Sequence, residues 1–82
     1  MDNVSELRRS IEFTIDGRPY KTGDPEQPAA DLLRLGGLDP ARFDLGELKG
    51  HRPDPVRYAD DTLVEIHNKA RFVGIRHRAD VA

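Results

Sequence analysis

The residues with the clearest chemical potential lie at the C-terminal end, where a predicted strand runs out into a tail. The tail reads Arg76, His77, Arg78, Ala79, Asp80, Val81 and Ala82. An accessible terminal carboxylate is what a protein needs in order to be activated and joined to another molecule. Activation brings backbone close to backbone in a nucleotide site, which favours glycine or other small residues. Ala79 and Ala82 are small, but Asp80 and Val81 are bulkier. Three outcomes therefore stay open: the tail is used as it stands, is trimmed first, or is never activated.

Other residues capable of chemistry do not combine into a site. His51, His67 and His77 share no metal-ligand spacing. Ser5 and Ser10 lie in or beside a predicted mobile arm, which gives a catalytic triad no rigid support. The absence of cysteine excludes disulfides, thiolate metal sites and a cysteine nucleophile. We therefore expect neither a catalytic site nor a metal or other cofactor.

The lysines are the candidate acceptors if copies of this chain are joined to one another. Lys21, Lys49 and Lys69 are the only lysines in the sequence, and all are predicted to be exposed. The terminal amine is a fourth candidate. The alternative is that each lysine serves solubility alone.

Composition limits the protein to one small domain. The chain has 82 residues and a net charge of −2, with 37% hydrophobic and 34% charged residues. Acids and bases are interspersed, so the basic stripe of a nucleic-acid-binding protein is missing. No apolar stretch approaches the roughly 20 residues needed to span a bilayer, and the N-terminus lacks the apolar core of a signal peptide. We expect a cytoplasmic protein with a flexible arm at 1–9, a domain at 10–78 and a tail at 79–82.

The first half of the domain predicts a hairpin and a helix. Residues 11–15 alternate between apolar and polar side chains, as a half-buried strand does. Asp16-Gly17 favours a tight hairpin, and 18–22 is the return strand, which Pro19 places at a sheet edge. The loop at 23–27 leads to a helix at 28–35, with Ala29, Leu32 and Leu33 on its apolar face and Gly36-Gly37 at its end.

The second half predicts three further strands. Residues 42–49 alternate again, with Phe43, Leu45 and Leu48 as apolar contributors. The segment 50–55 is too rich in proline and glycine to be regular, 62–66 is a short turn or strand, and 72–77 is the last strand. Right-handed crossover favours parallel pairing of the first and last strands. The expected class is α+β: a β-grasp, with a mixed sheet of four to five strands packed on one helix.

Three segments resemble ubiquitin-like proteins, over most of residues 10–78. Residues 37–45 (Gly-Leu-Asp-Pro-Ala-Arg-Phe-Asp-Leu) resemble the family's helix-ending glycine, proline turn and start of the third strand. Residues 61–66 and then 71–75 are similar to its loop and final strand. Together with Phe-Thr-Ile-Asp-Gly-Arg-Pro-Tyr at 13–20, they resemble most closely the bacterial multiubiquitin domains. The resemblance implies a protein modifier in bacteria that is joined through an isopeptide bond.

The resemblance also implies partners and a surface. The partners would be activating and conjugating enzymes of the ubiquitin type, a processing or deconjugating peptidase, and target proteins. Asp80 and Val81 stand where ubiquitin has its terminal diglycine, with Ala82 one residue beyond. The exposed apolar residue of ubiquitin's third strand corresponds to Gly46 or its neighbour, and Ile75 keeps part of that partner surface.

Two rival functions remain open. A non-covalent β-grasp module would self-associate through the edge strand near Pro19 or through the arm. A sulfur carrier ending in a thiocarboxylate makes the same demand for a slender terminus and is the weaker alternative.

Overall fold

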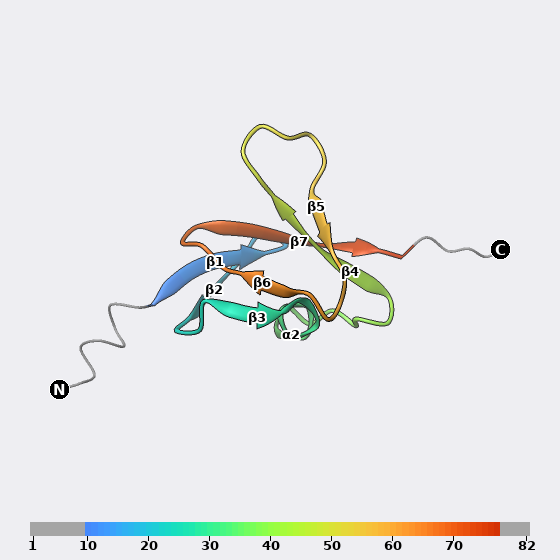
Figure 1. Ribbon diagram of the computed structural model, residues 1–82, viewed down its shortest axis with the longest axis horizontal. Helices are drawn as coiled ribbons and strands as arrows, with labels where there is room; N and C mark the ends of the chain where they lie inside the picture. Colours follow the sequence, from blue (N-terminus) through green and yellow to red (C-terminus); the bar gives the residue numbers. More distant parts are fainter. Residues whose placement is uncertain (1–9, 78–82) are drawn as a thin grey trace.

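The computed structural model describes residues 10–77 as two sheets and one helix (Figure 1). The elements are β1 (Ile11–Ile15), β2 (Arg18–Thr22), β3 (Glu26–Pro28), α2 (Ala29–Leu35), β4 (Phe43–Leu48), β5 (Val56–Tyr58), β6 (Leu63–Glu65) and β7 (Ala70–Arg76). Five strands form one mixed sheet in the order β2-β1-β7-β4-β5, and β3 pairs with β6 in a separate ribbon. The helix packs against one face of the five-stranded sheet, which confirms the predicted α+β architecture, consistent with a β-grasp.

The central pair of strands is parallel, as predicted. Phe13 lies opposite Ala70, and Ile15 lies opposite Phe72. The antiparallel hairpin of β1 and β2 turns at Asp16 and Gly17, whose φ angles are 51° and 84°. Two successive left-handed residues define the type I′ turn, whose twist matches that of the strands it joins. The prediction that β2 is an edge strand is also confirmed.

The core lies between the inner face of this sheet and α2. Its members are all at least nine-tenths buried: Phe13, Ile15, Ala29, Leu32, Leu33, Leu45, Val64, Ile66, Ala70 and Phe72. The rings of Phe13 and Phe72 meet edge to face, with centroids 5.9 Å apart. The predicted apolar face of the helix is confirmed, because Ala29, Leu32 and Leu33 have no exposed surface.

The helix ends where the glycine pair predicts. Gly37 adopts a φ of 80°, and its N–H donates to the carbonyl of Arg34. The N–H of Leu38 donates to the carbonyl of Leu33 at 2.8 Å. These two bonds form a Schellman motif, which satisfies carbonyls that the helix leaves without partners. Pro28, predicted as the first helical residue, is instead extended (ψ 144°) and ends β3.

The strand predicted at 42–49 is present as β4, and the structure shows which of its side chains face the core. Phe43, Leu45 and Glu47 alternate toward the core, whereas Leu48 lies on the outer face. Glu47 is only 4% exposed. Its carboxylate accepts a hydrogen bond from the hydroxyl of Tyr58 on β5, at 2.8 Å. A buried carboxylate therefore follows Phe43 and Leu45 on the inner face of this strand.

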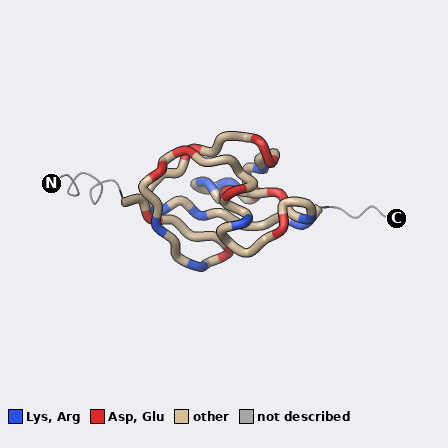
Figure 2. Tube along the Cα trace, turned by 90° about the horizontal axis from the view of Figure 1, so that it is seen from below, with Lys and Arg blue, Asp and Glu red and all other residues tan. Residues whose placement is uncertain are grey.

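Charge is mixed over the trace, as the composition indicates. Figure 2 shows acidic and basic positions interspersed, without a continuous stripe of either sign. Within residues 10–77 there is no helix with the length and hydropathy needed to cross a membrane.

Candidate functional site

The last strand loses one of its two neighbours halfway along. β7 pairs with β1 only at Ala70–Phe72, whereas its pairing with β4 continues to Arg76. We call the part with a strand on one side only, together with the next residue, the exit segment (73–77). Its last two residues, Arg76 and His77, are the first two of the predicted conjugation tail, so the contacts of this segment hold the start of that tail.

Asp16 contacts the last strand beyond the point where β1 ends. Its backbone N–H donates to the carbonyl of Phe72 at 2.9 Å. Its carboxylate accepts the N–H of Gly74 at 3.1 Å. The turn residue of the first hairpin thus supplies an acceptor to the open side of the exit segment, 58 positions away in sequence.

On the other side of the exit segment, the first residue of β4 and the residue before it contact Arg76 and His77. The guanidinium of Arg76 lies 5.5 Å from the centroid of the Phe43 ring, within the range of a cation–π contact. The N–H of His77 donates to the carbonyl of Arg42 at 2.8 Å. Backbone hydrogen bonding between the exit segment and the residues at the start of β4 therefore continues as far as His77.

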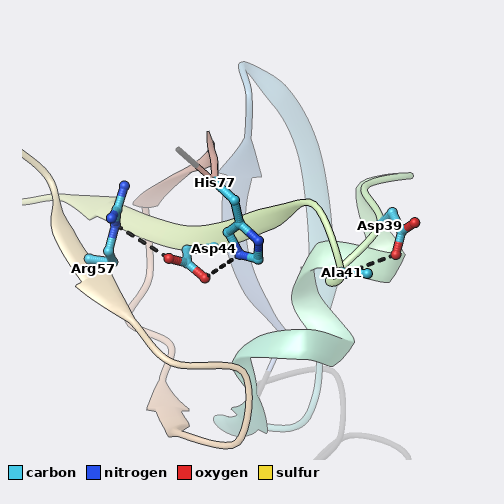
Figure 3. Close-up of polar contacts among 5 residues, drawn as sticks. All are labelled: Asp39, Ala41, Asp44, Arg57 and His77. Carbon is cyan, nitrogen blue, oxygen red and sulfur yellow. Dashed lines mark hydrogen bonds and ion pairs between the residues drawn. The ribbon is translucent and has the colours of Figure 1, made fainter. Parts of the chain in front are cut away.

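The ring of His77 joins a network of polar side chains on three strands or their ends (Figure 3). Its Nε2 lies 2.8 Å from Oδ1 of Asp44 on β4. The other oxygen of Asp44 lies 3.5 Å from Nε of Arg57 on β5. The Asp44 side chain is 24% exposed and that of His77 is 41% exposed, so the carboxylate is the more shielded partner.

A second carboxylate orders the turn that precedes β4. Asp39 Oδ1 accepts the N–H of Ala41 at 2.9 Å (Figure 3). The carbonyl of Asp39 accepts the N–H groups of Arg42 and Phe43. This turn fixes the carbonyl to which His77 donates.

The two residues predicted as a partner surface lie together on the outer face. A Cβ placed on Gly46 would lie 2.6 Å from Cδ1 of Ile75 and 3.2 Å from Cβ of Pro55. Gly46 is buried beneath these side chains, whereas Ile75 is half-buried. The accessible apolar side chains at this point of the outer face are therefore those of Ile75 and Pro55, and residue 46 itself is covered.

The three lysines are exposed but separate from one another. Lys21 Nζ lies 3.8 Å from Glu12 on the β1–β2 hairpin. Lys49 Nζ lies 4.0 Å from the buried carboxylate of Glu47. Lys69 adopts a φ of 72° in the turn before β7, at the opposite end of that strand from the exit segment.

The remaining predicted residues fall into two groups. Arg76 and His77 lie in the exit segment, while 78–82 and the arm at 1–9 lie outside the described residues. His51 and His67 lie in separate exposed turns, and residues 10–77 contain no group of three side chains able to hold a metal ion. Sequence reasoning missed Asp16, Asp44 and Arg57 as parts of the site, because their partners are distant in sequence. The DG pair singled out Asp16 only as a turn residue.

Comparisons with protein-family models, curated proteins and solved structures gave no match.

Proposed function

We propose that this protein is a ubiquitin-like modifier of other proteins, joined to them through its C-terminal carboxylate, either intact or after trimming. The observation that supports the proposal is the exit segment. It carries the chain off a β-grasp sheet with its last described residues anchored. A modifier needs this combination of a rigid body and a defined point from which its end departs.

The chemistry would be carried by partner enzymes. An activating enzyme would join the carboxylate to AMP, releasing pyrophosphate from ATP. An enzyme thiol would then displace AMP, and a lysine amine would displace the thiol, leaving an isopeptide bond and restoring the thiol. A peptidase would expose the reactive end or cleave the bond with water. The protein itself supplies the acyl group and the surfaces that these partners hold.

The outer face gives those partners a place to bind next to the exit. Val73, Ile75 and Leu48 alternate away from the core on β7 and β4, and Pro55 lies beside them. All four are half-buried, so they form a modest apolar surface without disturbing the core. An enzyme that contacts this surface would be close to the departing tail.

The test is reaction of the purified chain with its cognate activating and conjugating proteins and ATP, followed by intact-mass measurement. The full chain and chains ending at Ala79, Asp80 and Val81 cover the intact and trimmed cases, and a chain ending at His77 is the matched control without residues 78–82. We expect an ATP-dependent adduct with at least one of the first four chains and none with the control. Absence of any adduct with all four would refute the proposal.

A second function is favoured by the position of β2 at the edge of the sheet. A non-covalent module could extend the sheet by pairing this edge with another chain. Pro19 weakens the edge, since it has no N–H to donate. Concentration-dependent assembly of a chain lacking residues 79–82, measured by analytical ultracentrifugation, would support this function, and a strict monomer would count against it.

A further inference from the structure

We propose that Asp44 is a positioning residue that sets where the chain leaves the sheet, by holding the ring of His77 with one carboxylate oxygen while Arg57 holds the other. The structural part of this proposal stands on its own contacts. Its consequence for conjugation rests on the proposed function.

The end of the exit segment needs such an anchor because few backbone contacts remain there. The β1 pairing ends at Phe72, and the regular β4 pairing ends where Arg76 lies opposite Phe43. Beyond that point, the bond from the His77 N–H to the Arg42 carbonyl is the last backbone hydrogen bond found within residues 10–77. Hydrogen bonds at the ends of ladders open more easily than those in the middle of a sheet. A contact that holds the side chain of His77 should therefore reduce how often this bond opens.

The geometry assigns that role to Asp44. Its Oδ1 lies at hydrogen-bond distance (2.8 Å) from Nε2 of His77, and its Oδ2 lies 3.5 Å from Nε of Arg57. Each partner stands on a different element, so one carboxylate connects β5, β4 and the end of β7. The guanidinium of Arg76 does not compete for this carboxylate, because it lies over the Phe43 ring on the inner face.

Asp44 also stands next to the outer surface. It lies opposite Ile75 in the β4–β7 register and two residues before Gly46 in sequence, on the same face of β4. A partner that covers Ile75 would thus contact the body of the protein at the point where the departing chain is fixed. The anchor would present the tail to that partner from one defined position.

Amide hydrogen exchange measured by NMR tests the anchor directly, with the His77 amide as the probe and the Val73 amide, in the middle of the β4–β7 ladder, as the internal reference. In Asp44→Ala we expect the His77 amide to exchange about two to five times faster, the range for losing a partly exposed charged contact, with Val73 unchanged. Asp44→Asn keeps an acceptor oxygen and should stay within about twofold of the wild type at His77. Asp31→Ala removes an equal charge from the helix surface, where Asp31 pairs with Arg34 at 3.1 Å, and should leave His77 unchanged.

Two results would overturn the anchor. One is an unchanged His77 amide in Asp44→Ala. The other is equal acceleration at His77 and Val73, or loss of the folded spectrum, which would make Asp44 a residue needed by the whole sheet. Hydrogen exchange requires no partner enzyme. The anchor can therefore be judged even if the proposed function fails.

The consequence is tested by the rate of adduct formation with the cognate enzymes. We expect Asp44→Ala to form adduct at least twofold more slowly than the wild type, and Asp44→Asn to recover most of the rate. Faster exchange at His77 with an unchanged rate would overturn the positioning role. If neither the intact chain nor a trimmed one forms an adduct, the modifier function is refuted, while the exchange result still decides the anchor.

Discussion

Replacing Tyr58 by phenylalanine should destabilise the protein far more than its small change in size suggests. The Tyr58 hydroxyl donates to Glu47, whose carboxylate is 4% exposed. Within residues 10–77 the nearest cation is Lys49, whose Nζ lies 4.0 Å from the same oxygen. Removing the hydroxyl leaves a buried carboxylate with this distant cation and without its donor.

The magnitude follows from the kind of hydrogen bond that is lost. A bond to a charged group contributes about 1.5–3 kcal/mol, so we expect Tyr58→Phe to lower the free energy of unfolding by about 2 kcal/mol. For a domain of this size, that corresponds to a fall in Tm of about 8–16 °C. Glu47→Gln with Tyr58→Phe completes a double-mutant cycle, and the double variant should be less destabilised than the sum of the single variants.

The same contact predicts a pH dependence. Burial, the hydrogen bond to Glu47 and the charge of Glu47 raise the pKa of Tyr58 from 10.0 to about 12. Because the pKa is higher in the folded state, the stabilisation is complete below pH 10 and is lost as the pH rises from 10 to 12. The stability difference between the wild type and Tyr58→Phe should therefore shrink over that window.

Urea unfolding of both proteins from pH 7 to 11 measures these effects. Tyr20→Phe is the matched control, because Tyr20 is the only other tyrosine and its hydroxyl makes no hydrogen bond within residues 10–77. Equal destabilisation by Tyr58→Phe and Tyr20→Phe would refute the role given to the hydrogen bond between Tyr58 and Glu47. So would a difference between wild type and Tyr58→Phe that does not decrease above pH 10.

Three further predictions concern the fold and the exit segment. Phe72→Ala should cost about 3–5 kcal/mol because the ring is fully buried, and thermal unfolding should show little or no folded protein. Asp16→Gly should keep the turn but lose the acceptor for Gly74, so exchange of the Gly74 amide should rise severalfold while Asp16→Asn restores it; equal rates would contradict the contact. Gly37→Ala should lower stability by about 1–2 kcal/mol in urea unfolding, because φ is 80° there; a neutral effect would contradict the helix end described above.

Local patterns predicted the parts of the fold whose causes are local. The two positive φ angles at Asp16 and Gly17 follow from the residue types, as does the left-handed Gly37. The sequence did not predict β3 or β5. Each has only three residues, β3 ends in a proline, and each exists because a partner strand lies beside it. A segment of this length shows no clear period, and β6, which also has three residues, was predicted only as a short turn or strand.

The position of the candidate site could be predicted from the sequence, but the contacts that form it could not. The course of the chain indicated that it leaves the sheet through Arg76 and His77. The anchors of this exit come from Asp16 and Asp44, which are 58 and 33 residues from their partners. Aspartates are common, and nothing in the local sequence marks either of these two as a contact of the exit segment. Glu47 was missed for a similar reason, since its burial depends on a hydroxyl supplied by β5.

The most direct measurement of the central claim is mass spectrometry of tryptic peptides from the protein's native cell. Trypsin cleaves after Arg78, so an acceptor lysine joined to the intact tail would retain Ala-Asp-Val-Ala as a branch. A tail trimmed after residue 79, 80 or 81 would leave the corresponding shorter branch. We predict lysines that carry one of these branches, with the residue at its end identifying the mature terminus. Recovery of the protein only at its unconjugated mass, with no branched peptide in the cell, would contradict the account.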